Sequence, residues 1–148
     1  MTLKELQVLF PKATKRTWKH HTNPDGSKGG WVQKTACVAA TAYVGPDAQV
    51  YGNAWVYNNA RVHGYARVGD NAQVYGFAWV CDDAQVYGGA QVYGFAWVCD
   101  NARVYGFAWV CGNAWVRDST QVRDFAHVRD DAQISGNTII DKLWVQKN

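Results

Sequence analysis

A six-residue repeat constrains this chain more than any other feature. From position 36 to position 138, every sixth residue is Ala, except at Thr120 and Thr138. Val follows two residues after each of these positions, until Ile replaces it in the last two hexads. The eighteen hexads contain no insertion or deletion. A repeat this regular predicts one repetitive architecture for residues 36–140.

Each hexad reads as one short strand followed by one corner. In Ala78–Asp83, the Val at the third position lies on a strand, and its two neighbours must point the opposite way. Gly, Asp or Asn then follows, and these residues tolerate left-handed turns. Such a short strand cannot bury its own apolar side. We therefore predict an all-β fold, a parallel β-helix of three-stranded triangular coils with Val and Ala inside. Six coils would stand roughly 29 Å tall at ~4.8 Å per coil.

The repeats resemble those of the hexapeptide-repeat, left-handed parallel β-helix superfamily, which includes acyltransferases and γ-class carbonic anhydrases. They are most similar to poorly characterised bacterial and phage repeat proteins, through stretches such as Val50–Val56 after the lead-in Gly29–Val32. The resemblance covers roughly residues 29–140. It implies left-handed winding, because periodicity alone does not fix the hand. A fold does not dictate chemistry, so the resemblance leaves the function open.

The two ends of the chain depart from the repeat. Residues 1–35 are predicted to form an N-terminal cap, because an open coil end exposes strand edges that invite association. Within this segment, Leu3–Phe10 is expected to form a short helix or strand. The turn signal Thr22–Gly26 predicts a small hairpin. Residues 141–148 are predicted to form a C-terminal cap through their apolar side chains, Leu143, Trp144 and Val145.

Positive charge is concentrated in the predicted N-terminal cap. Residues 1–35 carry a net charge of +5, whereas residues 36–148 carry −2. Such a segment attracts nucleic acid or acidic protein surfaces, although a solvated lysine-rich cap is the simpler interpretation. A nucleic-acid site would use phosphate contacts and base stacking on Trp18 and His20. Its basic residues are Lys15, Arg16, Lys19 and Lys28.

The cysteine pattern and the hydropathy suggest a reduced, cytoplasmic protein. The four Cys include no CxxC pair and lack the density of a disulfide scaffold. No apolar run is long enough to span a membrane, and residues 1–20 lack the features of a signal peptide. Cys81 and Cys99 lie one coil apart. Two ligands make a poor metal site, so we expect free thiols there, with no metal and no cofactor.

One outward face of the predicted helix carries the strongest signal for binding. Trp79, Trp97 and Trp115 fall in register on consecutive coils, beside Cys81 and Cys99. A contiguous apolar stripe of this kind usually marks an interface, and Trp is enriched among interface anchors. Self-association into a dimer or trimer is favoured over a foreign partner. The predicted interface comprises Trp79, Trp97, Trp115, Cys81, Cys99, Arg61, Arg117, Trp55, Trp109, Phe77 and Phe95.

The sequence offers no catalytic centre. His63 and His127 fall on different faces, and no close pair of His provides the ligand spacing of a zinc enzyme. A corner column of Asp82, Asp100 and Asp118 could hold a cation, but Asp at such corners more often satisfies backbone groups of the turn.

These observations favour a non-enzymatic binding scaffold that presents an aromatic Trp/Tyr/Arg surface to itself and to a macromolecular partner. A rigid surface without loops loses little entropy on binding. The phage-like repeats suggest one concrete version, a phage-encoded inhibitor of a host defence protein. Two alternatives stay open. The first is an acyltransferase-like enzyme with a site between protomers, and the second is nucleic-acid binding through the basic cap.

Overall fold

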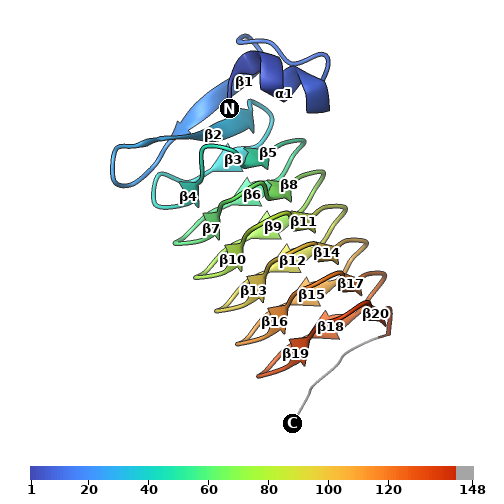
Figure 1. The fold of residues 1–148 in the computed structure, drawn as a ribbon. Coiled ribbons are helices and arrows are strands. Elements are labelled where there is room, and N and C mark those ends of the chain that lie inside the picture. The colour runs from blue at the N-terminus through green and yellow to red at the C-terminus, as the bar shows by residue number, and fades with distance from the viewer. Residues whose placement is uncertain (143–148) are drawn as a thin grey trace.

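The computed structural model describes residues 1–142 as one short helix and three β-sheets (Figure 1). Each coil of the chain contributes one two-residue strand to each sheet, and neighbouring coils stack along the long axis of the molecule (Figure 1). The fold is therefore a parallel β-solenoid of about six turns, as the repeat predicts.

The three sheets are called the cap sheet, which includes the N-terminal hairpin, and the Trp sheet and the Tyr sheet, which carry outward Trp and Tyr side chains. The cap sheet has the order β1 (Trp18–Thr22), β2 (Lys28–Gln33), β5 (Gln49–Val50), β8 (Arg67–Val68), β11 (Gln85–Val86), β14 (Arg103–Val104), β17 (Gln121–Val122), β20 (Ile139–Ile140). The Trp sheet has the order β4 (Tyr43–Val44), β7 (Arg61–Val62), β10 (Trp79–Val80), β13 (Trp97–Val98), β16 (Trp115–Val116), β19 (Gln133–Ile134). The Tyr sheet has the order β3 (Cys37–Val38), β6 (Trp55–Val56), β9 (Gln73–Val74), β12 (Gln91–Val92), β15 (Trp109–Val110), β18 (His127–Val128).

Backbone hydrogen bonds between coils fix the register at 18 residues. In the Trp sheet, Trp79 pairs with Trp97 and Val80 pairs with Val98. The Trp79 N–H donates to the Ala96 carbonyl oxygen at 2.9 Å. Every coil-to-coil pairing repeats this offset, which confirms the predicted assignment of side chains to the three faces.

The interior contains Val and Ala almost exclusively. Val80, Ala78 and Ala84 are fully buried, as are their counterparts in the central coils, whereas Val38, Thr138 and Ile140 in the end coils are not. These small, branched or compact side chains fill the narrow space between three sheets, and their burial supplies the main apolar stabilisation. Thr120 takes an Ala position and is also fully buried.

The corners use left-handed backbone conformations, as the Gly, Asp and Asn pattern predicts. Asp100 has φ of 59° and Gly94 has φ of 69°. The corner backbones of adjacent coils lie close together, because a Cβ added to Gly94 would be only 3.0 Å from the Gly112 nitrogen. Glycine therefore suits this corner for two reasons: it adopts the positive φ easily, and it has no Cβ to collide with the next coil.

The N-terminal segment folds over the first coil with its own small core. Helix α1 (Leu3–Leu9) begins with a capping box, in which Thr2 and Glu5 exchange hydrogen bonds between side chain and backbone. Leu6 is fully buried, and Trp18 and Trp31 are buried with it. The hairpin predicted around residues 22–26 is confirmed, because β1 pairs antiparallel with β2.

The hairpin joins the solenoid through backbone and side-chain hydrogen bonds. Strand β2 also pairs in parallel with β5, so part of the predicted cap range forms a rung of the cap sheet. The amide of buried Asn23 accepts from the Val44 N–H at 2.9 Å and donates to the Val44 carbonyl at 3.1 Å. His21 Nε2 lies 2.8 Å from the Ala42 carbonyl oxygen. These groups occupy edge positions of β4 that no further coil pairs with.

At the other end, β20 pairs with β17 and completes the cap sheet. The apolar residues predicted to form a C-terminal cap, Leu143, Trp144 and Val145, lie outside the described residues. Over residues 1–142, no helix is long and apolar enough to cross a membrane.

Candidate functional site

The Trp sheet presents a stacked aromatic column on its outer surface. Trp79, Trp97 and Trp115 project from β10, β13 and β16. Their ring centroids are 4.8 Å apart between the first two and 4.9 Å apart between the last two, and the planes are within 4° of parallel. The stack follows directly from the 18-residue register, because parallel in-register strands place identical side chains one above another.

A charged residue extends the column beyond the indoles. The Arg61 guanidinium carbon lies 5.3 Å from the centroid of the Trp79 ring and 4.7 Å from that of Tyr43. Arg61 is therefore sandwiched between two aromatic rings in a double cation–π contact. The resulting outer column on the Trp sheet is Tyr43, Arg61, Trp79, Trp97 and Trp115.

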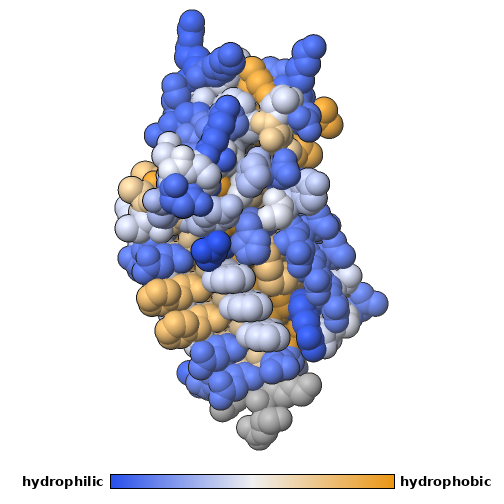
Figure 2. All heavy atoms as spheres, turned by 60° about the vertical axis from the view of Figure 1, so that its left-hand side comes forward, coloured by the Kyte–Doolittle hydropathy of each residue, from blue (hydrophilic) through white to orange (hydrophobic). Residues whose placement is uncertain are grey.

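Apolar and acidic corners border this column on opposite sides. Phe77 and Phe95 stack with centroids 5.2 Å apart at the corner before the sheet, and both are more than half exposed. Figure 2 shows this side of the molecule, where orange and near-white side chains form one surface in the lower half, with hydrophilic atoms above and to the right. We call the surface formed by Trp79, Trp97, Trp115, Phe77 and Phe95 the Trp face.

At the other corner, the carboxylates of an acidic column accept hydrogen bonds from backbone N–H groups of the next coil. Asp82 Oδ2 accepts from the Asp100 N–H at 3.2 Å, and Asp100 Oδ2 accepts from the Asp118 N–H at 3.0 Å. Asp118 Oδ2 in turn accepts from the Gly136 N–H at 2.9 Å. All three Asp have positive φ. This geometry supports the interpretation that these carboxylates stabilise the turns.

The cysteine pair of the Trp sheet corrects the sequence prediction. Cys81 and Cys99, expected to be free thiols, are joined by a disulfide, and their Cα atoms are 4.7 Å apart. Disulfides span Cα distances of ~4.4–6.8 Å, a range that includes the distance between facing residues of adjacent coils. The 18-residue separation of the two cysteines is the signal in the sequence that places them opposite each other. Cys37 and Cys111 are free.

A groove of about 270 Å³ runs beside the indole stack. The disulfide lies in it, His63 and Arg117 line its two ends, and Asp82 and Asp100 form part of its rim. Burial lowers the pKa of His63, and the neighbouring Arg61 charge acts in the same direction. His63 also contacts Trp79 edge to face, with ring centroids 5.3 Å apart.

Two residues of the predicted interface lie on a different surface. Trp55 and Trp109 project from the Tyr sheet, where Trp109 stacks on His127 with centroids 4.7 Å apart. Tyr57 and Tyr75 stack beside them, and the Tyr75 hydroxyl donates to a Gln91 oxygen at 3.1 Å. The structure therefore brings together the predicted residues of the Trp sheet and its Phe corner but places these two Trp elsewhere.

Hydrogen bonding of the side chains does not distinguish the two aromatic surfaces. Hydroxyls of the Tyr sheet find acceptors within the chain, as Tyr57 does with Gln73 at 3.3 Å. Among residues 1–142, however, the indole N–H groups donate to no acceptor on either surface, neither those of Trp79, Trp97 and Trp115 nor those of Trp55 and Trp109.

The basic cap exposes its predicted cations but not its predicted stacking residue. Lys15, Arg16, Lys19 and Lys28 are all exposed. Trp18, expected to stack on bases, is only 3% exposed because it packs against Phe10 in the core of the cap. The prediction that Trp18 offers a free ring is therefore wrong.

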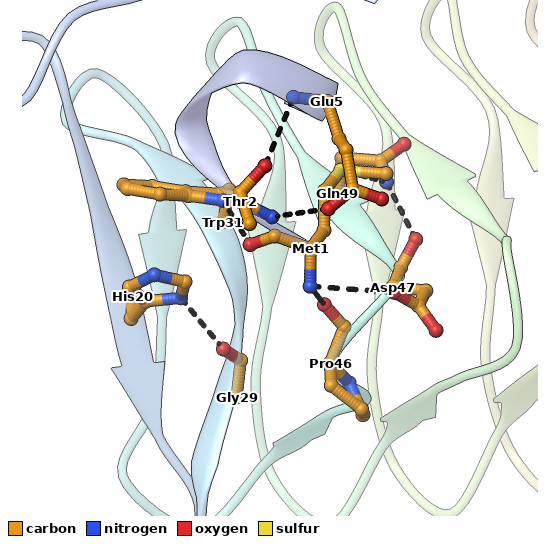
Figure 3. Close-up of polar contacts among 9 residues, drawn as sticks. All are labelled: Met1, Thr2, Glu5, His20, Gly29, Trp31, Pro46, Asp47 and Gln49. Carbon is orange, nitrogen blue, oxygen red and sulfur yellow. Dashed lines mark hydrogen bonds and ion pairs between the residues drawn. The ribbon is translucent and has the colours of Figure 1, made fainter.

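His20 is also engaged within the cap. Its ring lies 3.8 Å from that of Trp31 between centroids, and its Nδ1 lies 2.9 Å from the Gly29 carbonyl oxygen (Figure 3). The Trp31 indole donates to the Met1 carbonyl oxygen at 2.9 Å, and the Met1 amino group lies 3.4 Å from an Asp47 carboxylate oxygen. These contacts tie the chain start to the first coil.

Comparison with known proteins supports the repeat fold. A family model described as the YdcK beta solenoid repeat matches residues 48–64 and 96–112. Both segments begin at an Ala position and end at a corner Gly, so the match follows the hexads. No curated protein and no solved structure matched the chain.

Proposed function

We propose that this protein is a non-enzymatic binding scaffold that associates with a second copy of itself, and with a macromolecular partner, through the Trp face. The observation that carries the proposal is the stack of Trp79, Trp97 and Trp115, half-buried at the first two positions and exposed at Trp115, continued by Arg61 and flanked by the exposed Phe corner. Large aromatic side chains contribute most of the binding energy at protein interfaces, and Arg is the cation most often found among them.

Rigidity favours the same role. Coil-to-coil hydrogen bonds hold the strands and the corners, and the corners are short turns rather than mobile loops. The indole rings are held in position by stacking before any partner arrives. Binding to a preorganised surface costs less conformational entropy than binding to a flexible one.

The charges around the Trp face are self-complementary. Arg61 and Arg117 lie near its ends, whereas Asp82, Asp100 and Asp118 run along one edge. In a two-fold arrangement, a patch on one copy meets the same patch on the other. Arginines of one copy could then approach the acidic edge of its neighbour while the indoles pack at the centre. This complementarity supports self-association over binding of a single unrelated partner.

The test of self-association is solution mass for the wild type and for Trp97→Arg. We expect the wild type to form a dimer or trimer and the variant to be a folded monomer, because a charge in the middle of the indole stack would be desolvated in the interface. The matched control is Gln91→Arg, at the equivalent position of the Tyr sheet, which should leave the mass unchanged. Light scattering after size exclusion measures the mass, and far-ultraviolet circular dichroism checks folding. A Trp97→Arg protein that keeps the parental mass would refute the proposal.

The second part of the proposal is that the Trp face also binds a macromolecular partner. The narrower hypothesis, a phage-encoded inhibitor of a host defence protein, rests on the resemblance of the repeats. It predicts a specific partner captured by the wild type and lost with Trp97→Arg. Capture that is equal for both proteins would remove the Trp face from the hypothesis.

The alternative of an acyltransferase-like enzyme stays a prediction. His63 lies beside the Trp sheet, whereas His127 projects from the Tyr sheet, so a catalytic pair would have to form between copies. Calorimetric titration of the assembled protein with acetyl-CoA decides the matter. Measurable binding would favour the enzyme, and no heat would exclude this version of it.

We further propose that the solenoid winds left-handed with a triangular cross-section. Three parallel sheets and left-handed corner residues such as Asp100 support this geometry, as does the resemblance of the repeats. An experimental structure of the chain tests both features directly.

A further inference from the structure

The groove beside the indole stack gathers metal-binding side chains as well as apolar ones. Sulfur atoms of Cys81 and Cys99 and a carboxylate oxygen of Asp82 all lie within 4.8 Å of one another. Asp82 follows Cys81 directly in the chain, and Cys99 occupies the next coil at the same position. Two sulfur donors and an oxygen therefore converge from one edge of two coils.

We propose that reduction of the Cys81–Cys99 disulfide creates a binding site for a thiophilic divalent cation such as Zn²⁺, with Cys81, Cys99 and Asp82 as ligands and His63 as the fourth. The site lies in the groove that the three indoles also line, so it adjoins the proposed self-association surface, but its test reads cation binding rather than assembly.

His63 is assigned as the fourth ligand because of its position and because one ring nitrogen has no hydrogen-bond partner among residues 1–142. It occupies the same column as the two cysteines, one coil before Cys81, and lines the same groove. Its Nε2 is buried and has no hydrogen-bond partner among residues 1–142. A buried imidazole nitrogen without a partner is costly, and a bound ion is one explanation of such a group. Coordination of a cation would provide that missing partner.

The donor set matches the preferences of zinc. Thiolate, imidazole and carboxylate are its usual ligands, at ~2.3 Å for sulfur and ~2.0–2.2 Å for nitrogen and oxygen, in tetrahedral geometry. The hydrogen bond from the Asp100 N–H uses Asp82 Oδ2 and leaves Oδ1 available. Asp82 is exposed, which gives the ion a route in, whereas Cys81 is only 6% exposed.

Formation of the site requires a defined redox step. A dithiol reductant attacks the disulfide, the Cys81–Cys99 sulfur–sulfur bond breaks, and the reductant leaves as its own cyclic disulfide. Two electrons and two protons pass to the cysteines, which become thiols. Binding of the cation then displaces both protons to solvent, because thiolates are the ligands. In the oxidised chain the sulfurs are bonded to each other, so the oxidised chain should not bind the cation.

The test is titration of the full chain with Co²⁺, a coloured substitute for Zn²⁺, before and after reduction by a dithiol. Thiol counting should rise from the two free cysteines of the structure to all four in the sequence. We expect reduced protein to bind one Co²⁺ per chain, with thiolate charge-transfer absorption that Zn²⁺ abolishes by displacement. Oxidised protein should bind none.

Variants separate this site from the other cysteines. Cys81→Ser and Cys99→Ser should lose the charge-transfer bands, whereas the matched control Cys111→Ser should keep them. Asp82→Asn and His63→Gln should weaken binding by at least ~10-fold. Asn tolerates the left-handed conformation at position 82, so this change leaves the corner intact.

Several outcomes would overturn the proposal. These are the absence of Co²⁺ bands in reduced protein, their persistence in Cys81→Ser, and resistance of the disulfide to dithiol in the folded chain. Should the serine variants fail to fold, the comparison of oxidised with reduced wild type decides. Equal binding in the two forms would show that the thiolates are not ligands.

Discussion

Single positions in this chain are best explained by the place they occupy in the hexad. Asp100 is tolerated at a corner because its φ is positive and its carboxylate accepts the backbone N–H of Asp118 one coil later. Val80 is tolerated inside because it is small enough for the space between three sheets. A residue whose side chain does not suit its hexad position therefore lowers the free energy of unfolding, and Thr120 is such a residue.

Thr120 occupies an Ala position, is fully buried, and has a hydroxyl without a hydrogen-bond partner among residues 1–142. An unsatisfied buried polar group costs about 1–3 kcal/mol. Thr120→Val keeps the shape and removes the hydroxyl, so it should raise the free energy of unfolding by about 1 kcal/mol. Urea denaturation measures this as a higher midpoint at an unchanged slope. The control is Thr138→Val, at an exposed hexad position, which should not stabilise. A lower midpoint for Thr120→Val would contradict the argument.

At the scale of the element, each strand of two residues depends on its neighbours. No single coil can bury its Val and Ala side chains, and the first and last coils each lack one neighbour. The periodicity therefore predicted the strands, the register and the outward columns, because these follow from an 18-residue phase. The details of the N-terminal cap depend on contacts that occur once, such as the hydrogen bonds between the Asn23 amide and the Val44 backbone, so the repeat does not predict them.

Asn23 provides a test of how the cap is attached. Its amide bonds both the N–H and the carbonyl of Val44, and the side chain is only 3% exposed. Asn23→Ala should leave two backbone groups without partners and cost about 2–4 kcal/mol. Hydrogen exchange should show faster exchange at the Val44 amide while amides of central coils, such as that of Cys99, stay protected. Asp25→Ala, in the exposed turn of the same hairpin, is the control. An unchanged Val44 exchange rate would mean that the hairpin does not hold the edge of β4.

The candidate site was only partly visible in the sequence, for reasons specific to its residues. The repeat placed Trp79, Trp97 and Trp115 on one face, and the structure adds that their rings are parallel and that Arg61 continues the stack. The spacing of Cys81 and Cys99 predicts that they face each other on adjacent coils, but it does not tell whether the two sulfurs are bonded, as they are in the structure. The approach of the Asp82 carboxylate to that pair depends on side-chain directions at a corner, which periodicity does not specify.

At the scale of the whole molecule, the three sheets of the β-solenoid differ in what their outer surfaces contact. The cap sheet carries the hairpin, the Tyr sheet forms Tyr–Gln hydrogen bonds between its coils, and the Trp face presents three stacked indoles beside a Phe corner. Burial of that face between copies removes apolar area from water and shields the indoles. The central claim is therefore that the Trp face is covered in the assembled protein.

Hydroxyl-radical footprinting of the assembled wild type, read by mass spectrometry, tests this claim most directly. Phe107 and Phe125, stacked and exposed at a corner away from the Trp sheet, serve as internal references. We predict that labelling of Trp79 and Trp115 falls in the assembled protein relative to the monomeric Trp97→Arg variant, while the two Phe are labelled equally in both. Equal labelling of the indoles in assembled and monomeric protein would contradict it.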